Sequence, residues 1–247
     1  MTLRIKVNVI LEEVCDLIND QNCNLAKLKI LISKLPNVGR KTWGPLRPDS
    51  QEPILVRNPL QVAVMEAKSV KMVTFLVQNG FFVDALWQGV CRTFAGQRIE
   101  IRGLNSLSCA IARHDVKMVQ TLVQLGADVN LQIPCYSFYN GAWHYYYTTP
   151  LLTSVEMSNS QIVQTLFKLG ANLKLRALTS AGGELDCMTL AEQRQDFSIL
   201  KALQKESRKL KSLQDLCRIQ LRSQIQFKSL DFLQIPHCLI DYLKFKN

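Results

Sequence analysis

Three ten-residue segments of the chain are nearly the same: KMVTFLVQNG at 71–80, KMVQTLVQLG at 117–126 and QIVQTLFKLG at 161–170. Their apolar residues recur at the spacing of one helix face, which in the second segment consists of Met118, Val119, Leu122 and Val123. Each segment closes with a glycine, the residue that most readily adopts the left-handed conformation just after a helix C-terminus. The repetition predicts an array of similar helical units that bury their apolar faces against one another.

A second, shorter helix is expected upstream of each segment. The stretch TTPLLTSVEMSNS at 148–160 offers Thr149 as the N-cap and Pro150 at the first helical position, where a missing N–H group costs nothing. Two further stretches, NSLSCAIARHD at 105–115 and NPLQVAVMEAKS at 58–69, precede the other segments in the same way. We expect close approach of helices at three small residues, Ala110, Ser154 and Ala191.

This unit resembles the ankyrin repeat, in which the motif T-P-L-H-x-A precedes G-A-D by about 20 residues. The likeness is good at 105–130 and 149–172, where LGADVN and LGANLK close the units. It is looser at 58–84, where one extra residue falls between the helices. A terminal repeat is expected at 186–203 and a degenerate first repeat within 5–39. The resemblance implies an all-α solenoid, and a generic stack of helical hairpins is the alternative.

The connections between units are longer than those of an ankyrin array. Gly80, Gly126 and Gly170 are 46 and 44 residues apart, whereas the ankyrin period is about 33 residues. The excess lies in 84–104 and 131–148. Within the first loop, Arg98, Glu100 and Arg102 alternate with Ile99 and Ile101, which is typical of a half-buried strand. In the second, Asn140-Gly141 predicts a tight reversal between two strands.

The second loop is rich in aromatic residues. Rigid aromatic side chains with a polar group are enriched among the residues that dominate binding energy at protein interfaces. We therefore predict that this loop contacts a target protein through some of the following residues: Tyr136, Phe138, Tyr139, Trp143, Tyr145 and Tyr146. The alternative is that half of these rings cover the edge of the neighbouring repeat.

Composition excludes several classes of protein. Eight cysteines form no C-x-x-C pair and three histidines are scattered, so no metal site and no cofactor is predicted. No stretch approaches 18 apolar residues, which predicts no membrane insertion and an intracellular protein of the cytoplasm, with the nucleus as a second location. The segment NVGRKT at 37–42 lacks the frame of a phosphate-binding loop, and no catalytic set is recognisable, so we predict a protein that is not an enzyme.

The net charge of +10 is concentrated toward the C-terminus, where 201–247 holds ten Lys or Arg against four Asp or Glu. Nucleic-acid binding is one interpretation of such a balance, but no aromatic and basic groove motif supports it. Within this region Ser212 with Asp215 predicts a helix start, and an apolar face follows at Leu213, Leu216, Cys217 and Leu221. A cap that closes the helical array would account for this pattern.

The same region also resembles the SOCS box. Its first element, S/T-L-x-x-x-C-x-x-x-apolar, is matched by Ser212, Leu213, Cys217 and Leu221. The second element is matched by Leu233-Gln234-Ile235-Pro236, followed by Leu239 and Tyr242-Leu243, with Gln234 where the family usually has a proline. The resemblance implies an elongin contact through Ser212, Leu213, Leu216, Cys217 and Leu221. It implies a cullin contact through Leu233, Ile235, Pro236, Leu239 and Tyr242.

The chain as a whole thus resembles the ankyrin repeat and SOCS box family. We expect an N-terminal helical cap with a degenerate ankyrin-like repeat at 1–57, ankyrin repeats with long finger loops at 58–204 and a small three-helix SOCS box at 205–247. The resemblance implies a non-catalytic subunit that recognises substrates for a ubiquitin ligase in intracellular signalling. Its partners would be elongin B/C, a cullin of the fifth class with its RING protein, and a protein substrate. The alternative is an ankyrin scaffold without ligase activity, whose C-terminal helices only cap the array.

Overall fold

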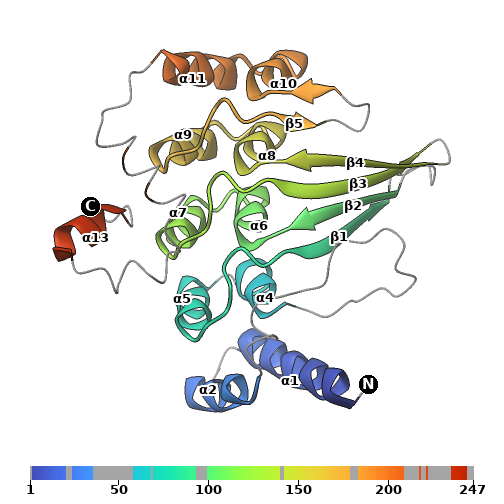
Figure 1. The fold of residues 1–247 in the computed structure, drawn as a ribbon, viewed down its shortest axis with the longest axis vertical. Coiled ribbons are helices and arrows are strands. Elements are labelled where there is room, and N and C mark those ends of the chain that lie inside the picture. The colour runs from blue at the N-terminus through green and yellow to red at the C-terminus, as the bar shows by residue number, and fades with distance from the viewer. Residues whose placement is uncertain are drawn as a thin grey trace.

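The computed structural model describes residues 2–20, 24–35, 58–67, 69–92, 99–139, 142–178, 183–208, 217, 221 and 235–243. The described part of the chain is mostly helical, as predicted. Helices pair and the pairs stack along one axis, with the N-terminal helices at one end and α10 and α11 at the other (Figure 1). Strands project from one side of this stack.

Four of the helix pairs share one design, a first helix of seven residues followed by a second of nine or eleven. The pairs are α4 (Pro59–Met65) with α5 (Val70–Gln78), α6 (Ser106–Ala112) with α7 (Val116–Gln124), α8 (Pro150–Glu156) with α9 (Ser160–Lys168), and α10 (Cys187–Gln193) with α11 (Phe197–Ser207). The three repeated segments form α5, α7 and α9. Gly80, Gly126 and Gly170 have φ angles of 98°, 103° and 94°, which confirms the predicted left-handed helix ends.

The first helix of each pair begins at a side chain that accepts a backbone hydrogen bond. Asn58, Asn105, Thr149 and Asp186 are these N-caps, and Asn105 forms a capping box with Ser108. The predicted start of α8 is confirmed, since the Thr149 hydroxyl accepts from the Leu152 N–H at 3.2 Å. Three of the four caps are buried, so each satisfies backbone donors that water could not reach.

Small residues recur where the first helices pack together. Ala63, Ala110, Ser154 and Ala191 occupy corresponding positions, and each is fully buried. Ser154 keeps its hydroxyl satisfied by donating to the carbonyl oxygen of Leu151 at 2.7 Å. The predicted close approach is therefore present in all four pairs, and a larger side chain there would separate neighbouring helices.

Hydrogen bonds between pairs repeat along the stack. Arg113 donates to the carbonyl oxygen of Met65 in the preceding pair, and Arg194 donates to that of Glu156, both at 2.8 Å. In the loops after the second helices, Asp84 accepts from the Asp128 N–H at 2.9 Å and Asn130 accepts from the Asn172 N–H at 2.8 Å. These contacts fix how one unit sits on the next.

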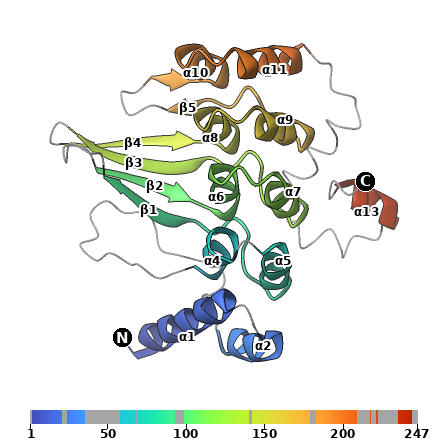
Figure 2. The same cartoon turned by 180° about the vertical axis from the view of Figure 1, so that it is seen from behind.

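At the N-terminal end lies a fifth helix pair of different proportions (Figure 2). Helix α1 (Thr2–Asn19) has 18 residues and α2 (Leu25–Lys34) has ten. Helix α1 packs against both α2 and α4. The buried residues of this pair are Leu11, Val14, Cys15, Ile18, Leu28, Leu31 and Ile32. They join one continuous apolar core with the other pairs.

The two long connections form strands. These are β1 (Trp87–Arg92), β2 (Ile99–Leu104), β3 (Ile133–Tyr139) and β4 (Ala142–Thr148), and two short strands, β5 (Ala177–Leu178) and β6 (Glu184–Leu185), follow. Strands β1 to β4 pair in chain order as one antiparallel sheet. Strands β2, β3 and β4 were expected from sequence. Strands β1, β5 and β6 were not, and neither was the pairing of β2 with β3, which joins two separate connections into a single sheet.

Candidate partner-binding surfaces

The register of the sheet brings the aromatic residues of β3 and β4 together with the apolar residues of β2. Tyr136 lies opposite Ile101 on one side and Tyr145 on the other. Two residues farther along β3, Phe138 lies opposite Ile99 on one side and Trp143 on the other. Directly opposed residues in antiparallel strands belong to the same face of the sheet, and so do residues two apart along one strand. These six residues therefore belong to one face of the sheet, which we call the aromatic face.

The remaining predicted target-binding residues belong to the opposite face. Tyr146 pairs with Cys135, and Tyr139 pairs with Ala142. Both pairs alternate along the strands with the pairs of the aromatic face. At the base of the sheet, Ile133 and Cys135 also belong to this opposite face, and both are buried. The opposite face is therefore turned toward the protein interior at its base.

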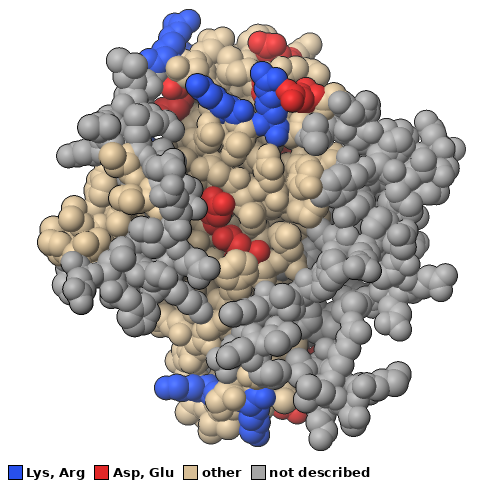
Figure 3. Space-filling view, viewed as in Figure 1, with Lys and Arg blue, Asp and Glu red and all other residues tan. Residues whose placement is uncertain are grey.

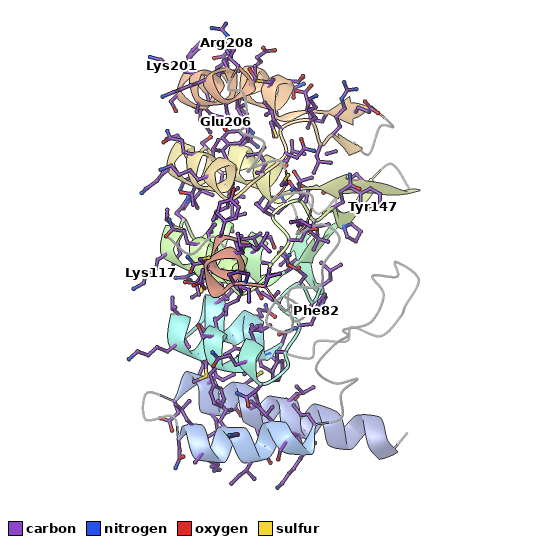
Figure 4. All side chains as sticks on the ribbon, turned by 60° about the vertical axis from the view of Figure 1, so that its left-hand side comes forward. Phe82, Lys117, Tyr147, Lys201, Glu206 and Arg208 are labelled. Carbon is purple, nitrogen blue, oxygen red and sulfur yellow. The ribbon has the colours of Figure 1, made fainter. Side chains whose placement is uncertain are left out.

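The last residues of β4 approach the helix stack. Tyr146 and Tyr147 are half-buried, and Tyr147 lies on β4 to one side of the stack (Figure 4). Next to this strand, β5 pairs with β6, and Arg176 forms an ion pair with Glu184 there. Asn140 and Gly141 lie outside the described residues, and the flanking residues Tyr139 and Ala142 pair with each other. The predicted hairpin is thus confirmed at its strands.

The C-terminal region is described at a few positions. Cys217 and Leu221 are helical and exposed, and Leu221 is exposed to 42%. Exposure of these two side chains is compatible with the predicted elongin contact. Ser212, Leu213 and Leu216 of the same predicted contact lie outside the described residues.

A short helix, α13 (His237–Leu243), forms the other described part of this region. It begins directly after Pro236, whose carbonyl oxygen accepts from the Leu239 N–H at 2.9 Å. Leu239 is 48% exposed, Pro236 is exposed, and Ile235 and Tyr242 are half-buried. Leu233 lies outside the described residues. Of the described residues of the predicted cullin contact, Pro236 and Leu239 are thus the exposed ones.

Two buried residues give α13 an inner face. Ile240 and Leu243 are 4% and 5% exposed. Their spacing of three residues is the signal of one helix face. Sequence reasoning placed Leu243 on this turn but missed Ile240, although the same spacing could have found it.

Chemistry of the buried thiols agrees with a structural role. Burial raises the pKa of Cys109 and of Cys187 to about 12, so both thiols remain protonated at neutral pH. A buried thiol of this kind behaves as a small apolar side chain. Within the described ranges no group of three metal-ligating side chains comes together, and none of the described helices has the length and apolarity to cross a bilayer.

Comparison with known families identifies a SOCS box at residues 209–244. SOCS boxes recruit ligases built from elongin B/C and a cullin. The match begins one residue after the end of the described helix stack and lies inside the predicted range 205–247. It covers a small part of the chain and contains every residue of the two predicted ligase contacts. No curated protein matches this chain.

Proposed function

We propose that this protein is the substrate-recognition subunit of an elongin B/C–cullin–RING ubiquitin ligase. The observation that carries the proposal is the SOCS box match at 209–244, directly after a stack of helix pairs that ends with α11. A recruiting module joined to a repeat array has the organisation of an adaptor, in which one part holds the ligase and the other holds a target. In this proposal the protein is not itself an enzyme, and it works in the cytoplasm or nucleus.

The helix stack is proposed to be an ankyrin array. Supporting features are the helix pairs of nearly constant length, the left-handed glycines after α5, α7 and α9, and the hydrogen bonds that recur between units. Arrays of this kind present extended surfaces on which insertions mark the binding side. Both long insertions of this chain join in one sheet, so a single surface carries them.

The ligase contacts are assigned residue by residue. Ser212, Leu213, Leu216, Cys217 and Leu221 would dock elongin C, with Cys217 leaving room for a partner side chain. Leu233, Ile235, Pro236, Leu239 and Tyr242 would meet a cullin of the fifth class. Because Gln234 replaces the usual first proline, we expect cullin recruitment to be weaker than elongin capture.

The target is proposed to dock on the aromatic face. Four of the six candidate residues, Tyr136, Phe138, Trp143 and Tyr145, share that face by register. Removal of a large aromatic anchor from an interface typically costs about 2 kcal/mol or more, which is roughly thirtyfold in affinity. Tyr139 and Tyr146 belong to the other face and are expected to contribute less.

Two matched pairs of tyrosines test this assignment. Proximity labelling and ubiquitin profiling would compare the wild type, Tyr136→Ala/Tyr145→Ala on the aromatic face, and Tyr139→Ala/Tyr146→Ala on the opposite face. We expect the first pair to lose labelled and ubiquitinated proteins that the second retains, with elongin binding equal in all three. Equal loss in both pairs, or loss in neither, would contradict docking on the aromatic face.

Adaptor activity itself is tested by elongin capture. Replacement of Leu213 by Gln together with Cys217 by Arg should abolish co-purification of elongin B/C, while the thermal unfolding of the helix stack stays unchanged. A scaffold whose C-terminal helices only cap the array would bind no elongin in either form. Unchanged capture by the double variant would place the elongin contact elsewhere.

A further inference from the structure

The outer surface of the N-terminal helix pair combines exposed apolar residues with charges of opposite sign. Among the described residues, no helix packs beyond α1 and α2 at this end of the stack (Figures 1 and 2). Val9 on α1 is 51% exposed, and Leu25 and Ile30 on α2 are 51% and 59% exposed. The end of this array therefore presents apolar side chains to solvent on both of its helices.

On α1 acidic residues follow the apolar residue, whereas the sequence places Lys6 three residues before it. Glu12 and Glu13 follow Val9 by three and four residues, so they are its neighbours on one helix face. Asp16 continues the same face, Asp20 is the first residue after the helix, and all four acidic residues are exposed. This face lies opposite the residues that α1 buries, among them Leu11 and Ile18.

On α2 the charges around the apolar residue are basic. Lys27 precedes Ile30 by three residues and Lys34 follows it by four, so both are its neighbours on the helix surface. Lys29 is exposed as well. Figure 3 shows basic residues at the lower end of the stack, with acidic residues beside them. The pair thus carries an acidic helix face next to a basic one.

We propose that this end of the stack binds a second copy of the chain. In a two-fold symmetric contact, a patch of one copy that contacts a second patch of the other copy implies the reverse contact as well. The acidic face of α1 in one copy then lies against the basic face of α2 in the other, and this happens twice. Val9 lies at one end of the acidic cluster and Ile30 lies between Lys27 and Lys34, and burial of both adds an apolar contribution.

Local charge permits this association although the whole chain is strongly basic. The net charge of the chain is +10, which by itself opposes self-association. At this end, however, four acidic residues, Glu12, Glu13, Asp16 and Asp20, stand against five basic ones, Arg4, Lys6, Lys27, Lys29 and Lys34, so the local balance is close to neutral. Opposite charges brought together across the interface favour one relative orientation of the two copies.

The expected dimer is weak. At 1.5 Å per residue, α1 is about 27 Å long and α2 about 15 Å, and helices are about 10 Å wide. The two outer faces together offer roughly 400 Å² per copy as a flat footprint, which is at the small end of specific interfaces. We therefore expect a transient dimer rather than an obligate one.

Dimerisation at this end would make the adaptor bivalent. The SOCS box follows α11 at the opposite end of the stack, so the contact leaves the start of the box away from the interface. Two linked target-binding surfaces hold a repetitive or dimeric target more firmly than one, because the second binding event becomes intramolecular. This inference concerns assembly of the protein and stands whether or not the box recruits a ligase.

Charge exchange between two variants tests the proposal. Glu12→Lys/Glu13→Lys makes both helix faces basic, and Lys27→Glu/Lys34→Glu makes both acidic. Each variant alone should self-associate at least about tenfold more weakly than the wild type in sedimentation equilibrium, since like charges then meet across the contact. An equimolar mixture should recover dimers, because every basic face then meets an acidic one.

A matched variant and salt complete the test. Lys117→Glu/Lys168→Glu changes the same charge on α7 and α9, away from this end, and should dimerise like the wild type. Salt near 1 M should weaken the wild-type dimer, because exposed charges are then screened within about 3 Å. A wild type that stays monomeric up to roughly millimolar concentration would overturn the proposal, as would a mixture that dimerises no better than its components.

Discussion

The helix stack is built from a repeated sequence, whereas the sheet that projects from it is not. In the stack, α5, α7 and α9 repeat nearly the same residues because each occupies the same environment, with a neighbour on either side. In the sheet, β2 and β3 pair with each other yet share no motif. Strand β2 contains Ile-Glu-Ile, whereas β3 is rich in aromatic residues. Packing between units thus constrains the sequence of the stack, whereas no repeated packing constrains the sequence of the sheet, which is proposed to bind the target.

Substitution in the stack should have the largest effect on stability. Leu122 is fully buried in α7 between two other pairs, so Leu122→Ala leaves a cavity and should cost about 3 kcal/mol. Chemical denaturation monitored by circular dichroism measures this loss. A cost below about 1 kcal/mol would mean that the units pack less tightly than their burial indicates.

A change of equal size on the sheet should leave stability nearly untouched and reduce target binding instead. Phe138→Ala/Trp143→Ala on the aromatic face should shift the melting temperature little, since the face is proposed to serve a partner. Loss of labelled targets together with an unchanged melting temperature would sharpen the contrast between the two regions. A drop of several degrees with targets retained would show that these residues pack against the protein itself.

Between these extremes, the N-caps contribute to stability in a pH-dependent way. A hydrogen bond from the Thr189 N–H lowers the pKa of Asp186 below its ordinary value, with smaller contributions from Met188 and the positive charge of Arg176. A carboxylate whose pKa is lower in the folded state stabilises the fold above its unfolded pKa, about 3.9, and loses this contribution as pH falls through the folded value.

Two substitutions separate the cap from its charge. Asp186→Ala should cost about 1 kcal/mol at pH 7, whereas Asp186→Asn should retain most of the cap. The asparagine variant should also lose less stability than the wild type between pH 5 and pH 2. Unfolding curves at several pH values check this, and identical acid sensitivity of the two proteins would contradict the role of the carboxylate.

The smallest expected effect is a gain. Gln195 has a φ of 56° in the turn between α10 and α11, and it is exposed. Because glycine adopts this conformation without the steric cost that other residues bear, Gln195→Gly should stabilise the last pair by up to about 1 kcal/mol. Ser158→Gly at the corresponding turn of the third pair should gain less, because it also removes the hydrogen bond between the Ser158 side chain and Asp196. A loss in both variants would indicate that the turn is held by the side chain.

The sequence predicts the stack well because its signals are local. Helical spacing, the N-cap Thr149 with Pro150 at the first helical position, and the closing glycines each act within a few residues, and the structure confirms them. The pairing of β2 with β3 could not be predicted in this way. It depends on how two connections from different units lie side by side, and no turn residue or pattern within either connection records that contact.

For the candidate binding residues too, local features were predicted from sequence and spatial arrangement was not. Tight reversal at Asn140-Gly141 predicted the hairpin, but which aromatic residues share a face became clear only from the register. In the C-terminal region, the match of a SOCS box confirms the motif found at Ser212 to Tyr242. The roles assigned there to single residues remain predictions, and Ile240 was overlooked.

Binding of purified elongin B/C is the most direct test of the proposed adaptor function. Isothermal titration would compare the full chain with a form that ends at Arg208, the last described residue of the stack before the SOCS box match. We predict saturable binding by the full chain, and no binding by the shortened form, which retains the thermal transition of the helix pairs. Absence of binding by the full chain, or equal binding by both forms, would contradict the adaptor function.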